Sequence, residues 1–92
     1  MKPRRRGPFT VTLARLPGKG GWTYVTVPKR LTPPITRAWG RTPVLAVVDG
    51  VAWETSVWRS KTGEGFLPVP KRIRVEKEQG DKVTVEFSFV DD

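Results

Sequence analysis

Histidine and cysteine are both missing from this 92-residue sequence, which narrows the chemistry that the chain could perform. Most nucleophile and base pairs of enzymes use one of these side chains. General acid-base catalysis would therefore have to use carboxylates or lysines. The mid-chain carboxylates are Glu54, Glu64, Asp81 and Glu86, and each occupies a turn or a solvent-facing strand position. No closely spaced cluster of oxygen ligands indicates a metal site, and we expect no cofactor. We therefore predict that the protein is not an enzyme.

The aromatic residues suggest binding instead. The sequence contains four tryptophans, and the core of a domain this small does not readily bury four indole side chains. Trp22 with Tyr24, and Trp58 with Arg59, could form an aromatic and cationic surface that stacks bases or contacts a protein. Trp58 shares a strand face with Glu54 and is expected to be the most exposed.

The alternative interpretation of the tryptophans is that they belong to the core and its cap. We favour that interpretation for Trp39 and Trp53, because large apolar side chains are usually buried.

The basic residues are concentrated in the first half of the chain. Residues 1–48 carry ten Lys or Arg and no acid, whereas residues 49–92 carry seven Lys or Arg and nine acids. The candidate basic surface comprises Lys29, Arg30, Arg37 and Arg41, together with the tail from Arg4 to Arg6. Clustered cations attract phosphate backbones. The competing interpretation is that these charges lie on a tail and on solvated strand faces.

Two function classes follow. The first is a small non-catalytic binding or interaction module, whose partner is an unidentified protein, a small ligand or a second copy of the chain through an aromatic face. The second is a nucleic-acid-binding domain that uses the basic residues. No segment reaches the length of a membrane span and no secretory signal is present, so we expect a cytoplasmic protein without a membrane partner.

The stretch from Arg41 to Leu67 organises the fold. Residues 43–48 are an unbroken apolar run, typical of a strand that is buried on both faces. Asp49 and Gly50 suit a two-residue hairpin turn, because both positions tolerate positive φ. Residues 51–58 alternate and return as a second strand, and Phe66 begins a third.

The N-terminal part predicts a basic tail followed by two strands and a helix. Residues 1–7 have too little apolar surface to be ordered, so we expect a disordered tail and a single domain over residues 8–92. Residues 9–13 and 22–27 read as strands joined by a turn at residues 18–21. Residues 32–40 predict a short helix, in which Thr32 caps and Gly40 terminates. Its Ile35, Ala38 and Trp39 would close an open end of the sheet.

The C-terminal part contains one ambiguous segment. Residues 71–77 alternate like a strand, but the i, i+4 pairs Arg72-Glu76 and Arg74-Glu78 also suit a helix. The final strand is unambiguous, because Val83, Val85, Phe87 and Phe89 alternate with polar residues. Six short strand segments predict a small, mainly β barrel, since an open sheet of this size would leave two raw edges.

The order of these motifs resembles the family called domain of unknown function 1905. The resemblance covers about residues 8–90 and rests on these segments: Gly20 to Pro28, Gly40 to Val44, Asp49-Gly50, Thr55 to Val57, Gly63 to Leu67 with Val69, Lys71 and Arg72, and Gly80 to Val85.

The resemblance implies a six-stranded, double-split pseudobarrel capped by one or two short helices. It also implies a helix over Lys71 to Lys77 with Val75 as its core contact. It supplies no catalytic or binding residues. A likeness of this barrel to bacterial transcription-regulator barrels is the analogy behind the nucleic-acid alternative.

Overall fold

A computed structural model describes residues 3–17 and 22–90, and it is dominated by one antiparallel sheet. The strands are β1 (Arg4–Thr12), β2 (Ala14–Arg15), β3 (Thr23–Val27), β4 (Arg41–Val48), β5 (Val51–Arg59), β6 (Gly65–Pro68) and β7 (Lys82–Phe89). The helical elements are the 3-10 turns η1 (Lys29–Leu31) and η2 (Ala38–Gly40) and the short helix α1 (Lys71–Arg74). The mainly β prediction is therefore confirmed.

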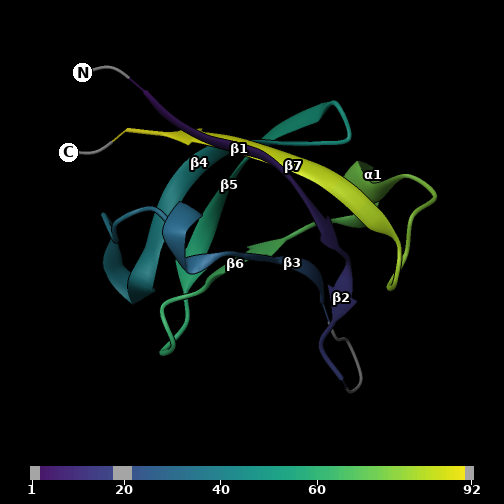
Figure 1. Ribbon diagram of the computed structural model, residues 1–92, viewed down its shortest axis with the longest axis horizontal. Coiled ribbons are helices and arrows are strands. Elements are labelled where there is room, and N and C mark those ends of the chain that lie inside the picture. Colours follow the sequence, from purple (N-terminus) through teal and green to yellow (C-terminus); the bar gives the residue numbers. More distant parts are fainter. Residues whose placement is uncertain (1–2, 18–21, 91–92) are drawn as a thin grey trace.

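The sheet curls into a barrel-like shape because its two edge strands, β1 and β2, are consecutive parts of one chain segment. The strand order is β1-β7-β4-β5-β6-β3-β2, and only Leu13 separates β1 from β2. In Figure 1, β1 and β7 cross the top of the view while β3 and β6 run beneath them. Counting β1 and β2 as one strand gives the six strands that the sequence predicted.

The central hairpin forms as predicted. Val48 pairs with Val51, and the two turn residues have positive φ, 48° at Asp49 and 84° at Gly50. The side chain of Asp49 adds support, because its Oδ1 accepts the backbone N–H of Thr84 at 2.9 Å. The hairpin is thereby fixed to β7.

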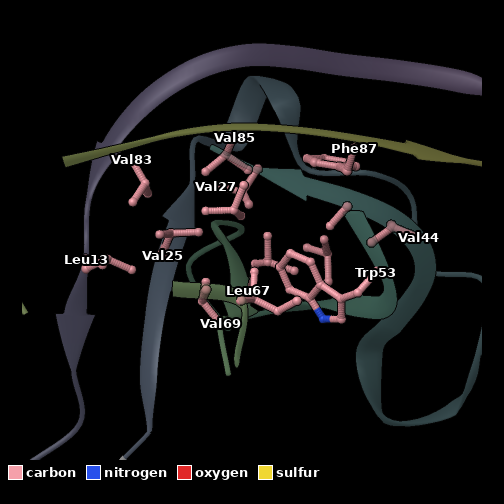
Figure 2. Close-up of a cluster of buried hydrophobic side chains, with 14 of the residues drawn as sticks. Leu13, Val25, Val27, Val44, Trp53, Leu67, Val69, Val83, Val85 and Phe87 are labelled. Carbon is pink, nitrogen blue, oxygen red and sulfur yellow. The ribbon is translucent and has the colours of Figure 1, made fainter. Parts of the chain in front are cut away.

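The core lies inside the curled sheet. Alternate side chains of β3, β4, β5 and β7 point inward (Figure 2), among them Val25, Val44, Trp53 and Phe87. The predicted inward face of β7 is confirmed, since Val83, Val85, Phe87 and Phe89 are all buried. Trp53 is buried as predicted.

Strand β4 corrects the prediction of burial on both faces. Thr42, Val44, Ala46 and Val48 are buried, whereas Pro43 and Leu45 are exposed. Both neighbours, β5 and β7, pair with β4, but no second layer covers its outer face among the described residues. An apolar run therefore does not by itself establish two-sided burial.

In the structure Arg4 to Gly7 belong to β1, although their composition favoured a disordered tail. Arg4, Arg5 and Arg6 pair with Phe89, Ser88 and Phe87 of β7. Arg5 forms a salt bridge with Glu86, and the Arg6 guanidinium lies 5.1 Å from the ring centre of Phe89. Backbone pairing, which composition does not reveal, orders this segment. Residues 1 and 2 lie outside the described part.

The predicted helix over residues 32–40 is also wrong. The chain forms η1 before it and η2 at its end, and residues 32–36 are not helical. Thr32 does not cap a helix; its Oγ1 lies 3.0 Å from the carbonyl oxygen of Pro28 and donates to it. Ile35 and Trp39 are exposed and do not close the barrel. Consecutive prolines at residues 33 and 34 favour an extended backbone over a helix.

The ambiguous segment after Pro70 is helical at its start. Helix α1 covers Lys71–Arg74, and Val75 has a φ of 60° that ends it. The buried contact is Ile73, whereas Val75 is 65% exposed, so the expected core role of Val75 is wrong. The predicted turn at residues 18–21 lies outside the described residues. No helix in residues 3–17 or 22–90 is long and apolar enough to cross a membrane.

Candidate functional site

An aromatic strip lies on the outer face of β3, β5 and β6. We use this name for Trp22, Tyr24, Trp58 and Phe66. Because Thr23, Val25 and Val27 point inward, Tyr24 points outward, and the same alternation turns Phe66 and Trp58 outward. Trp58 pairs directly with Phe66 across β5 and β6, so their side chains share one face.

Three members of the aromatic strip have rings in contact. The rings of Tyr24 and Phe66 stack with their centres 4.4 Å apart, and Trp22 is tilted against Phe66 at 6.3 Å. Trp22 is 56% exposed, whereas Tyr24, Phe66 and Trp58 are half-buried. Three predicted residues are thus brought together by a fourth that the sequence reasoning did not single out. The alternation of Gly65 and Leu67 with Phe66 was the signal that could have found it.

Arg41 extends the row at the β5 side of the aromatic strip. It is the pairing partner of Trp58 across β4 and β5. Its Nη1 donates to the hydroxyl of Ser56 at 3.4 Å, a neutral acceptor that leaves the positive charge uncompensated. The row from Arg41 through Trp58 to Phe66 crosses three neighbouring strands spaced about 4.8 Å apart.

Three other predicted cations gather at the adjacent end of the barrel. Arg59 donates from Nη2 to the carbonyl oxygen of Pro33 at 2.9 Å. Lys29 lies against the turn between β5 and β6, because a Cβ added at Gly63 would stand 3.6 Å from the Cε of Lys29. Arg30 follows in η1 and is exposed. We call Lys29, Arg30, Arg41 and Arg59 the basic end.

The basic end has no carboxylate partner within the described residues. The salt bridges of this part of the chain are Arg5 with Glu86, Arg74 with Glu78, and Lys77 with Asp49, none of which involves the basic end. The charge asymmetry of the sequence therefore survives folding at this place. Elsewhere the two halves of the chain do interleave, because Arg5 pairs with Glu86.

Arg37 lies to the other side of Arg41. A backbone bridge joins Arg37 to Arg41, and its guanidinium donates to the carbonyl oxygen of Thr36 at 2.9 Å. It borders a hollow with Pro3, Leu45 and Ser88, over β4 and β7. Arg37 is thus linked to the aromatic strip through Arg41, the pairing partner of Trp58.

Two tryptophans differ from their predicted exposure. Trp39, expected in the cap, is 89% exposed and has a φ of 68°. Trp58, expected to be the most exposed, is half-buried, and its pairing partners in the sheet are Phe66 and Arg41. Strand alternation gave the correct face for Trp58, but the outer face is itself partly covered by neighbouring aromatic rings.

The carboxylates considered for catalysis have structural partners or lie in solvent. Glu86 pairs with Arg5, and Asp81 accepts the backbone N–H of Glu78 at 2.8 Å. A hydrogen bond from Lys77, followed by one from the backbone of Thr84, lowers the pKa of Asp49 below its usual value. Asp49 belongs to the hairpin turn. Among the described residues, no three His, Cys, Asp or Glu side chains gather as metal ligands.

A pocket at the other end of the aromatic strip was not anticipated. Its volume is about 360 Å³, and Trp22 and Pro68 line it together with Arg15 and Arg74. Arg15 borders the pocket because β2 pairs with β3, as the predicted hairpin between the first two strands requires. The pocket is therefore a product of barrel closure.

Comparison with known proteins identifies a family. The family described as domain of unknown function (DUF1905) matches residues 9–87, from β1 through most of β7. The comparison with curated proteins found no match. The family match spans all four members of the aromatic strip and all four members of the basic end. Because it covers most of the sequence, the chain belongs to the domain of unknown function 1905 family.

Proposed function

We propose that this protein is a non-catalytic binding module that recognises another protein through the aromatic strip. The observation that carries the proposal is the placement of four aromatic side chains, three from the strands β3, β5 and β6 and one from Trp22 just before β3, on the outer face of the sheet. Aromatic residues are enriched at protein interfaces and dominate their binding energy. The strip is held on strands, so little conformational entropy is lost when it is covered.

Contacts among the rings support this use. Tyr24 and Phe66 stack on each other, which fixes their orientation before a partner arrives. Trp22 and Arg41 stand at opposite ends of the group and provide the residue types that are most common at interface hot spots. A partner with an apolar and acidic surface would complement this arrangement.

Selection from a random-peptide display library tests the proposal. Peptides selected on the full chain should bind the double variant Trp22→Ala/Tyr24→Ala at least tenfold more weakly, because truncating hot-spot aromatics costs about 2 kcal/mol or more. The matched control is Leu45→Ala, which removes an exposed apolar side chain from the outer face of β4, outside the strip. Circular dichroism melts establish that each variant is folded.

Three results would contradict the proposal. The first is a selection that yields no binders, the second is selected peptides that bind the double variant as well as the original chain, and the third is selected peptides whose binding depends on Leu45 instead. Sedimentation velocity on the same samples reports whether a second copy of the chain is the partner, since self-association through the strip would be lost in the double variant only.

A second candidate function, nucleic-acid binding, is favoured by the basic end. Four cations lie at one end of the barrel without a carboxylate partner in residues 3–17 and 22–90. The aromatic strip begins beside one of them, Arg41. Aromatic rings next to cations are the usual surface for single-stranded nucleic acids, because bases stack and phosphates pair.

Two matched double variants test this candidate. Lys29→Gln/Arg30→Gln and Lys71→Gln/Arg72→Gln each remove two exposed cations from a single helical turn. If the basic end binds single-stranded DNA, the first variant should weaken binding of an oligothymidine. It should also reduce the slope of log affinity against log salt concentration by the amount expected for up to about two lost phosphate contacts. Equal effects of both variants would mean attraction by net charge alone, and would exclude the basic end as a site.

A further inference from the structure

The strongest additional feature of the molecule is the pocket at the end of the barrel where β3 begins and β6 ends. Its volume of about 360 Å³ lies within the range of small-ligand sites. Its apolar walls come from Trp22, Pro68, Val69 and Pro70, and two arginines, Arg15 and Arg74, border it. A flat, apolar ligand with an anionic group would match both parts of this lining.

Backbone and side-chain hydrogen bonds fix the walls of the pocket. The N–H of Val69 donates to the carbonyl oxygen of Thr23 at 2.9 Å, which joins the end of β6 to the start of β3. Arg74 donates from Nε to the carbonyl oxygen of Val69 at 3.0 Å, which ties α1 to the same segment. The pocket is therefore preformed, and a ligand would not have to order it.

The two arginines differ in whether their guanidinium groups already have hydrogen-bond partners. Arg74 also donates to the carbonyl oxygen of Lys77 and to the carboxylate of Glu78, so its charge is compensated. The side chain of Arg15 has no hydrogen bond or salt bridge to any other residue in the described part of the chain. No carboxylate belongs to the lining. The rim at Arg15 is thus an uncompensated positive charge beside an apolar floor.

We propose that this pocket binds a small aromatic carboxylate. The aromatic ring lies between the indole of Trp22 and the rings of Pro68 and Pro70, where flat apolar surface is available. The carboxylate pairs with the guanidinium of Arg15, which can form two parallel hydrogen bonds with it. This inference shares Trp22 with the proposed binding function but rests on a different residue, Arg15, so the two proposals can fail separately.

A titration of the isotope-labelled full chain with indole-3-acetate and with its neutral isostere indole-3-acetamide tests the inference by NMR. The acid should shift the amide signals of Arg15, Thr23 and Val69 and the indole N–H of Trp22. The amide should bind about tenfold more weakly, since a hydrogen bond to a charged group contributes roughly 1.5 to 3 kcal/mol.

The variant Arg15→Gln should remove this preference by weakening the acid about tenfold and leaving the amide unchanged. Arg72→Gln is the control, because Arg72 is an exposed cation of α1 that does not line the pocket. Equal binding of acid and amide, shifts that map elsewhere, or no binding of the acid would overturn the inference. We expect Arg15→Gln to keep peptide binding to the aromatic strip. A loss of peptide binding in this variant would contradict the claim that the strip and the pocket are separate sites.

Discussion

Trp39 is held in a conformation that is costly for its residue type. Its φ of 68° lies in the left-handed region, and its side chain is 89% exposed, so packing does not offset the strain. Left-handed backbone costs a residue with a Cβ roughly 1 to 2 kcal/mol. Burial therefore does not explain why a large aromatic side chain occupies this position.

We expect Trp39→Gly to raise the free energy of unfolding by about 1 kcal/mol, because glycine removes the Cβ strain and no packing is lost. Urea unfolding measures the change. The control is Trp39→Phe, which keeps the strain and should alter stability by less than about 0.5 kcal/mol. A loss of stability in Trp39→Gly would mean that the indole makes a stabilising contact.

Asp49 makes the stability of the protein dependent on pH. A hydrogen bond from Lys77 and another from the backbone of Thr84 lower the pKa of Asp49 from 3.8. A carboxyl with a lowered pKa in the folded state stabilises the protein above the pKa of the unfolded state, and this stabilisation is lost as the pH falls through the folded value.

The variant Asp49→Asn should therefore lose less stability than the original chain when the pH is lowered from 5 through about 3. Asparagine tolerates the positive φ of this turn position, so the hairpin is retained. Unfolding followed by tryptophan fluorescence at several pH values gives the comparison. Parallel pH profiles for the two chains would contradict the assignment.

At the scale of elements, helix α1 contributes one buried side chain to the core. Ile73 is 3% exposed and Val75 is 65% exposed, although both alternate with charged residues in the sequence. The helix register decides which of the two packs inward, and the chain turns away at Val75.

Ile73→Ala should lower the free energy of unfolding by about 2 to 4 kcal/mol, which is typical of truncating a buried aliphatic side chain. Val75→Ala is the matched control and should change it by less than about 0.5 kcal/mol. Urea unfolding of both variants checks the prediction. The reverse order would restore Val75 as the core contact.

The alternation of apolar and polar residues correctly predicted which side chains of the strands face the core. It placed the inward residues of β7 and the outward position of Tyr24 correctly, because one side of the sheet faces the core. It failed where pairing partners decide the structure. Arg4 to Arg6 pair with β7, and residues 32–36 are not helical although their spacing suited a helix.

The candidate site was predictable in part for the same reason. Trp22, Tyr24 and Trp58 were found by residue type and face, but their grouping depends on the pairing of β5 with β6 and of β6 with β3. Phe66 and Arg15 were missed because each gains its role from a neighbour that is distant in sequence. Only the strand order brings such residues together.

At the scale of the whole molecule, the segment from Arg4 to Arg15 completes the barrel. It pairs with β7 through β1 and with β3 through β2. The first part of this strand is basic and exposed, yet it contributes backbone pairing, the salt bridge of Arg5 with Glu86 and the contact of Arg6 with Phe89.

Deletion of residues 1–7 should therefore lower the free energy of unfolding by on the order of 1 to 3 kcal/mol, because several backbone hydrogen bonds are lost. Hydrogen exchange of the β7 amides should become faster at the same time. A chain lacking only Lys2 and Pro3 is the control. Unchanged stability after the longer deletion would show that the segment behaves as a tail.

The central claim is that this family member binds a partner with the outer face of β3, β5 and β6. The most direct measurement is NMR mapping of one selected peptide on the isotope-labelled full chain. We expect the largest shifts at Tyr24, Trp58 and Phe66 and at the indole N–H of Trp22, with little change on the outer face of β1 and β7. Shifts concentrated on β1 and β7, with those four residues unaffected, would contradict the claim.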